Sequence, residues 1–355
     1  MNNKHTVSEF IEYFKQEETT VIDEQSIEEE LQHDQTDQSS IAIKILSVFG
    51  GLFATLTLLG FLLLGLYDSK MGLLFFGFLF IAGSIVVNKT VEKIITDTAS
   101  ICAYMTGHGL IAFALMELQS NNSMVCILFI GISLVTLFIT QTYVLSFIAA
   151  LIALVSMLSI IFIEEVNNAI HGYVIVLTIL LTYVLLNEAT IITQLRRFSK
   201  LYAPISMAII VALIVSLGVI NTSNINDIPI EYGWVSSMVT IASVVFILSR
   251  IIKVYELENI NIKIVAYVAV AFILLPTLFA PAISGALLIL LLCFLINHKT
   301  GLVTGIISFI YFISQYYYDL HFTLLVKSII LFSTGILCLL IYIFIIKKIE
   351  SNESI

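Results

Sequence analysis

Residues 120–163 read SNNSMVCILFIGISLVTLFITQTYVLSFIAALIALVSMLSIIFI and contain no charged side chain. As one α-helix this segment would be about 66 Å long, whereas the hydrocarbon core of a bilayer is about 30 Å thick. It is too long for one membrane crossing and therefore predicts two antiparallel transmembrane helices. The polar triplet Thr140-Gln141-Thr142 near its middle is the expected turn.

On both sides of this segment, uncharged runs alternate with small clusters of charge. Residues 264–297 would also be too long for one crossing, at about 51 Å, and Pro276 and Pro281 predict a break near Ala280-Pro281. Shorter runs of single-crossing length lie between Lys44 and Asp68, Lys70 and Lys89, Asp97 and Glu117, Glu165 and Glu188, Lys200 and Asp227, and Glu231 and Arg250. A last pair, 301–318 and 322–346, is divided at Asp319-Leu320-His321, which brings the expected number of helices to about twelve.

Composition supports a membrane protein. Hydrophobic residues make up 59% of the chain and charged residues 12%, where a soluble domain carries roughly 25% charged residues. The mean hydropathy of +1.05 agrees. We therefore predict an all-α, polytopic transmembrane helix bundle with an acidic N-terminal tail at residues 1–40, a membrane domain at 41–348 and a short cytoplasmic C-terminus at 349–355.

The net charge of -9 belongs to the tail. Residues 1–40 hold eleven acidic residues against Lys4 and Lys15, and the rest of the chain is balanced. Capping-box sequences at Thr6 and Ser26 predict two short amphipathic helices there. Their acidic polar faces disfavour anionic lipid and favour a protein partner, and an acidic chain also disfavours nucleic acid.

The signs of the charges predict the orientation. With the N-terminus inside and twelve crossings, Lys70 is the only basic residue in an outer loop, and Lys327 lies within a helix. The remaining basic residues all fall on the cytoplasmic side, as the positive-inside rule requires. Both termini are therefore expected in the cytoplasm.

Lys327 is one candidate functional residue, because a charge inside an apolar run is costly and is by default a site. It lies just after Tyr318, Asp319 and His321, and Ser328 follows it. One interpretation is a cation that binds an anionic solute or headgroup, or that pairs with Asp319. The other is a lysine that reaches back to the outer interface with the tyrosines as an ordinary aromatic belt.

His108, near the middle of an expected helix, is the second candidate. A histidine in mid-membrane can relay protons or can simply bond to a neighbouring helix, and we expect it to face the bundle interior. Gly301 and Gly305 are typical of close helix packing. No histidine or cysteine set has ligand spacing and no catalytic motif is present, so we expect no metal, no cofactor and no positive sign of an enzyme.

The stretch YYYDLHFTLLVKS at 316–328, followed by Gly335 and Leu339-Leu340, resembles a bacterial membrane protein family catalogued as domain of unknown function 4401. The resemblance implies a multi-pass protein of the bacterial inner membrane and marks Lys327 and Ser328 as pattern positions. It implies no activity.

Twelve helices with little mass outside the membrane favour a carrier or channel for a small or lipidic solute. The alternative is a membrane scaffold or sensor that acts through a protein partner bound to the acidic tail.

Overall fold

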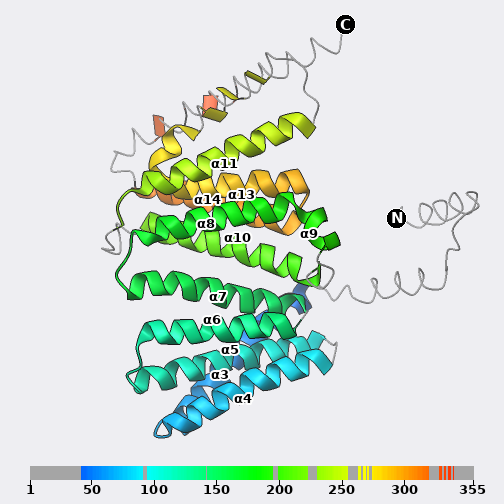
Figure 1. The fold of residues 1–355 in the computed structure, drawn as a ribbon, viewed down its shortest axis with the longest axis vertical. Helices are drawn as coiled ribbons and strands as arrows, with labels where there is room; N and C mark the ends of the chain where they lie inside the picture. The colour runs from blue at the N-terminus through cyan, green and yellow to red at the C-terminus, as the bar shows by residue number, and fades with distance from the viewer. Residues whose placement is uncertain are drawn as a thin grey trace, which may run out of the picture.

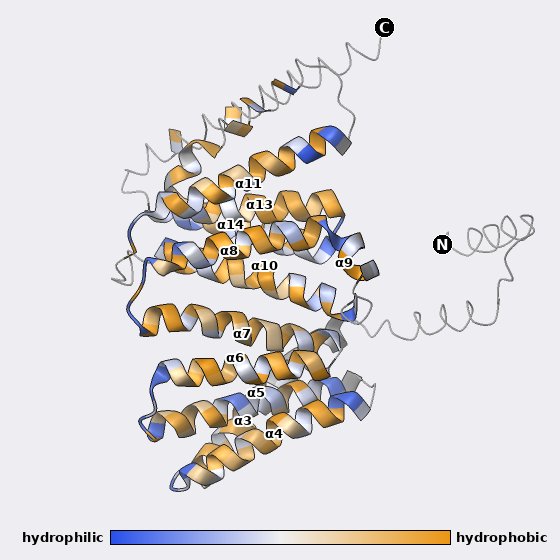
Figure 2. Cartoon of the chain, viewed as in Figure 1, coloured by the Kyte–Doolittle hydropathy of each residue, from blue (hydrophilic) through white to orange (hydrophobic). Residues whose placement is uncertain are grey.

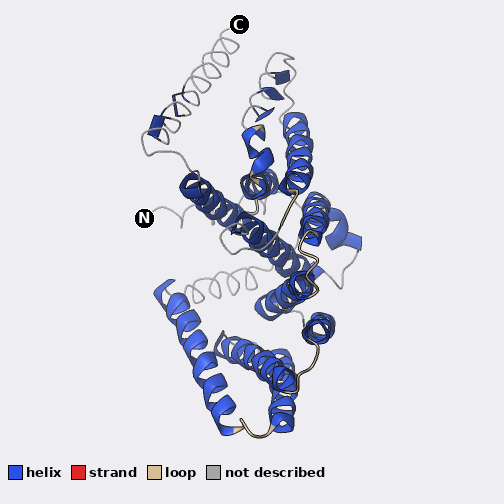
Figure 3. Ribbon diagram, turned by 90° about the vertical axis from the view of Figure 1, so that its left-hand side faces the viewer, coloured by secondary structure: helices blue, strands red, loops and turns tan. Residues whose placement is uncertain are grey.

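The computed structural model describes residues 41–90, 94–140, 142–194, 199–222, 230–254 and 274–319, with short pieces within 263–271 and 328–339. Every regular element in this part of the chain is helical (Figure 3). The tail at 1–40 and the C-terminal residues 349–355 lie outside the described residues, so the expectations placed on them stay predictions.

The helices lie side by side, and successive connections alternate between two ends of the molecule (Figure 1). In chain order they are α3 (Ile41–Gly65), α4 (Lys70–Thr90), α5 (Ile94–Glu117), α6 (Asn122–Ile139), α7 (Tyr143–Ile163), α8 (Ala169–Leu186), the short α9 (Glu188–Gln194), α10 (Ser199–Thr222), α11 (Gly233–Val254), the 3-10 helix η2 (Pro276–Phe279), α13 (Pro281–Ile296) and α14 (Lys299–Asp319).

Within the described residues, seven helices are long and apolar enough to cross a membrane. They are α4 to α8, α10 and α11, with α5 counted from Asp97 and α11 to Lys253. The all-helical fold of these residues is thus confirmed, and the seven candidate spans agree with a membrane bundle. The count of about twelve goes beyond what these residues show.

Both expected breaks in the overlong runs are confirmed. Helix α6 ends at Ile139, Thr140 is extended (φ -99°, ψ 148°), and α7 begins at Tyr143. Farther along, η2 ends at Phe279 and Pro281 opens α13. Proline is well placed at the first position of a helix, where its missing N–H would have had no partner.

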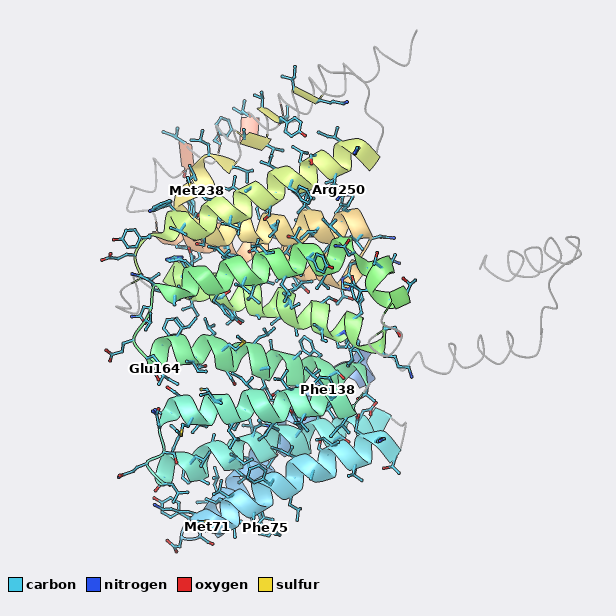
Figure 4. All side chains as sticks on the ribbon, in the orientation of Figure 1. Met71, Phe75, Phe138, Glu164, Met238 and Arg250 are labelled. Atoms are coloured by element: carbon cyan, nitrogen blue, oxygen red, sulfur yellow. The ribbon has the colours of Figure 1, made fainter. Side chains whose placement is uncertain are left out.

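The helices are hydrophobic along most of their length, and hydrophilic residues gather at the two ends of the bundle (Figure 2). Phe61, Leu64 and Met71 are 73%, 85% and 72% exposed. Figure 4 shows Met71 and Phe75 at the outer face of α4. Such a surface suits lipid contact, because the exposure of a broad apolar area to water is unfavourable.

Helix packing is closest where glycines face a neighbouring helix. A Cβ added at Gly107 of α5 would lie 2.8 Å from the Gly77 carbonyl oxygen of α4. One added at Gly305 of α14 would lie 3.2 Å from the Leu290 Cα of α13, so the close packing expected at Gly305 is confirmed. The largest apolar core joins α7, α8, α10, α11, α13 and α14, and a smaller one joins α4, α5 and α7.

Candidate functional site

The C-terminal candidates lie at the edge of the described chain or beyond it. Lys327 and His321 fall outside the described residues, and Asp319 is the last residue of α14. Tyr318 is 78% exposed and its ring meets that of Tyr317 edge-on. Ser328 is exposed in one of the short described pieces. A site at Lys327 therefore stays a prediction.

His108 is buried among helices, in agreement with the expectation that it faces the bundle interior. Its side chain is 6% exposed. The Nδ1 atom lies 2.9 Å from the Tyr104 carbonyl oxygen one turn earlier, and the ring packs against those of Tyr104 and Phe129. Since a carbonyl only accepts, Nδ1 carries the proton. In the neutral ring Nε2 is then an acceptor, and it has no partner in the described part of the chain.

Tyr104 connects α5 with α6. Its ring is fully buried, and its hydroxyl donates to Thr136 Oγ1 at 3.2 Å. Thr136 in turn donates to the Ile132 carbonyl of its own helix at 2.8 Å. Ser133, one turn earlier on the same face of α6, is fully buried near the Tyr104 hydroxyl, and its own hydroxyl does not donate to a carbonyl of α6. These residues were missed from the sequence.

A second group of polar side chains gathers where α4 ends, α5 begins and α6 turns into α7. Asn88 is 4% exposed and donates to Asp97 Oδ1 at 3.1 Å. The Asn88 Oδ1 atom accepts a hydrogen bond from Thr142. Thr140, also buried, donates to the Thr136 carbonyl at 2.8 Å. This bond links the turn to the Tyr104 group.

We call the combined set the α5–α6 polar track. It consists of Asn88, Asp97, Thr142, Thr140, Thr136, Ser133, Tyr104 and His108. It begins at the end of the bundle that carries the α4–α5 and α6–α7 turns. It ends at His108, which lies about 21 Å along α5 from Ile94, the first residue of that helix. Ser84 of α4 and Ser146 of α7 lie in the halves of their helices that are nearest these turns. Both are buried, and neither hydroxyl has a hydrogen-bond partner in the described residues.

The unbonded atoms of this track are energetically unfavourable unless they bind something. A buried polar group without a partner costs about 1–3 kcal/mol, and the hydrocarbon around a transmembrane bundle supplies no partner. Buried serines usually avoid this cost by donating to a carbonyl of their own helix, as the fully buried Ser216 does to Leu213 at 2.9 Å. Ser84, Ser133 and Ser146 do not. The arrangement can therefore offer both acceptors and donors to a polar solute.

The other buried histidine, His171, shows the contrasting case. Its Nε2 lies 2.6 Å from the Glu231 carbonyl oxygen, and its Nδ1 lies 3.3 Å from Ser236 Oγ. The Glu231 N–H donates to Asn168 Oδ1 at 2.9 Å. Both ring nitrogens have hydrogen-bond partners, so His171 links α8 to the start of α11. It was missed because it follows Asn167 and Asn168, where a polar loop would be expected.

Charged groups lie near the helix ends. Lys70 donates to the Glu117 carbonyl at 2.6 Å and lies 3.8 Å from its carboxylate, and Ser123 donates to Glu164. Within the described residues, no group of three or more His, Cys, Asp or Glu could hold a metal ion. The buried polar residues of this part of the chain are serine, threonine, asparagine and histidine, together with Tyr104 and Tyr202.

Comparison with known proteins identifies a family. A family model described as Domain of unknown function (DUF4401) matches residues 41–348. No curated protein and no solved structure matches the chain. The family match covers most of the chain and spans the polar track as well as the C-terminal tyrosine and lysine-serine motif. This chain therefore belongs to the DUF4401 family.

Proposed function

We propose that this protein is a carrier or channel for a small or lipidic solute, and that its solute contacts the α5–α6 polar track. The observation that carries the proposal is the Nε2 atom of His108, which lies at the middle of a membrane-length helix and has no partner among the described residues. It lies at the end of a series of buried polar side chains rather than alone. If these helices had only a structural role, their buried polar groups would be expected to have hydrogen-bond partners within the protein.

The proposal includes the setting of the protein. We propose that about twelve helices cross the inner membrane of a bacterium with both termini in the cytoplasm, as the charge asymmetry indicates. The alternative function, a scaffold or sensor that works through a partner at the acidic tail, requires no path for a solute. The two functions therefore differ in a measurable quantity, the flux across a membrane that contains only this protein.

The test is reconstitution into liposomes with two readouts. Swelling in glycerol or urea, followed by light scattering, reports a small solute. Dithionite quenching of a fluorescent lipid reports a lipidic one. We expect at least one rate to exceed that of empty liposomes, and the double variant Tyr104→Phe with Thr136→Val to lower it at least tenfold, because it removes the hydroxyl pair with little change of volume.

The matched control is Thr57→Val, which removes an exposed hydroxyl that donates to the Phe53 carbonyl of its own helix. It should keep the parent rate. Equal rates with protein-containing and empty liposomes in both assays would reject the carrier or channel and leave the scaffold.

A further inference from the structure

We propose that the α5–α6 polar track is a one-sided water path, open at the α6–α7 turn and closed beyond His108, which admits a small water-soluble solute that donates a hydrogen bond. The inference rests on the proposed function and adds to it the side of entry and the class of solute.

The distribution of polar groups along the helices carries the sidedness. From the turn inward, the buried positions of the track are Thr140 at the turn, Thr136 and Ser133 on α6, and Tyr104 and His108 on α5. Beyond His108, the next buried positions of α5 are Leu110, Ile111 and Ala114, all fully buried. Water has hydrogen-bonding partners in the first half of the bundle and none on this face of α5 in the second.

Two contacts close the path beyond His108. The Phe129 ring stands edge-on to His108, with ring centroids 5.0 Å apart. Ile111, one turn after Gly107, packs on Gly77 of α4, where an added Cβ would lie 2.6 Å from Ile111 Cγ1. This contact leaves no room for a solute between α4 and α5 beyond His108, because protein interiors are close-packed with few voids.

The chemistry at the end of the path selects the solute. The His108 Nε2 atom accepts a hydrogen bond, so it matches an O–H or N–H group of the solute. Ser133 adds a hydroxyl that can donate or accept. The outward faces of the same helices are apolar, for example Val135, which is 55% exposed. A lipid chain would find its place there and not in the track, so the inference selects the water-soluble solute over the lipidic one.

Cysteine labelling tests the path. In a chain whose native cysteines are replaced by alanine, Ser133→Cys and Thr136→Cys report the track, while Val135→Cys reports the lipid face of the same helix. Because the thiolate is the reactive form, labelling needs water at the site. Lys89→Cys and Asp68→Cys, both exposed and at opposite ends of α4, mark the two membrane sides.

We expect a membrane-impermeant methanethiosulfonate to label Ser133→Cys and Thr136→Cys only from the side that labels Lys89→Cys. Val135→Cys should react at least tenfold more slowly. Labelling from neither side, from both sides, or only from the side of Asp68→Cys overturns the path, even if liposome flux is found. One-sided labelling without any flux supports the path and removes the proposed transport.

Discussion

The two buried histidines differ in how their ring nitrogens are bonded. Among the described residues, His108 has a bond at Nδ1 and none at Nε2, whereas His171 has partners at both. A hydrogen bond in a folded protein contributes about 0.5–1.5 kcal/mol, and an unpartnered buried group costs about 1–3 kcal/mol. The same substitution at the two positions should therefore have different effects on stability.

We predict that His171→Leu lowers the melting temperature in detergent, because it leaves the Glu231 carbonyl without its side-chain partner and weakens the α8–α11 contact. His108→Leu should leave the melting temperature unchanged or raise it while abolishing liposome flux. Thermal unfolding followed by size-exclusion chromatography measures both variants. If His108→Leu is destabilised as much as His171→Leu, the role of His108 is structural.

Lys327, the charged residue within an apolar run, supports a second prediction at this scale. A lysine near the membrane centre costs about 2.5–3.5 kcal/mol and less near an interface, so its presence alone proves nothing. If it binds an anion or pairs with Asp319, Lys327→Met should abolish flux while Lys327→Arg keeps part of it. Both should be compared at matched amounts in the membrane. Full flux in the Met variant would show that the charge of Lys327 is not needed for transport.

Among the helix pairs, α4 and α5 depend most visibly on side-chain size. A Cβ at Gly107 would lie 2.6 Å from Ile81 Cγ1 as well as 2.8 Å from the Gly77 carbonyl oxygen. A backbone oxygen cannot rotate away, so the two helices would have to separate. At Gly83 of α4 an added Cβ meets nothing within 4 Å.

Gly107→Ala is therefore expected to destabilise the protein by about 1–3 kcal/mol, the usual cost of overpacking. Gly83→Ala should be neutral or slightly stabilising, because alanine has the higher helix propensity. Thermal unfolding of the two purified variants under the same detergent conditions makes the comparison. Similar melting temperatures would mean that α4 and α5 can separate without cost.

The helices themselves could largely be predicted from the sequence, because bilayer thickness limits helix length independently of packing. This limit requires a break in each of the two overlong runs, and the polar triplet at Thr140 and the proline at Pro281 locate the two breaks. Burial of His108 also follows, since an imidazole is costly in lipid. The residues that surround His108 could not be predicted in this way. Tyr104, Thr136 and Ser133 are ordinary residues of apolar helices, and their meeting depends on how α5 pairs with α6. Asn88 stands beside Lys89 and so resembles a loop residue.

For the whole molecule, the membrane helices carry the apolar surface and the acidic tail carries the net charge. All long apolar runs follow Lys44, and insertion depends on such runs. We predict that a chain starting at Ser40 still reaches the membrane in normal amount. Membrane fractionation and immunoblotting against the full-length protein measure this. Loss of the shortened chain from the membrane fraction would show that the tail is needed for folding or insertion.

The orientation of the whole chain gives the last prediction. Lys89, Arg250 and Lys299 lie at one end of the helix array, whereas Asp68, Glu117 and Glu165 lie at the connections of the other end. Cytoplasmic loops are enriched in Lys and Arg, so the first end should face the cytoplasm. With an even number of crossings the C-terminus faces the same side. Alkaline phosphatase fused after Ile355 should therefore be inactive, and the same enzyme inserted after Asp68 should be active. Strong activity after Ile355 with activity also after Asp68 would mean an odd number of crossings, which would reject the count of twelve while leaving the α5–α6 polar track in place.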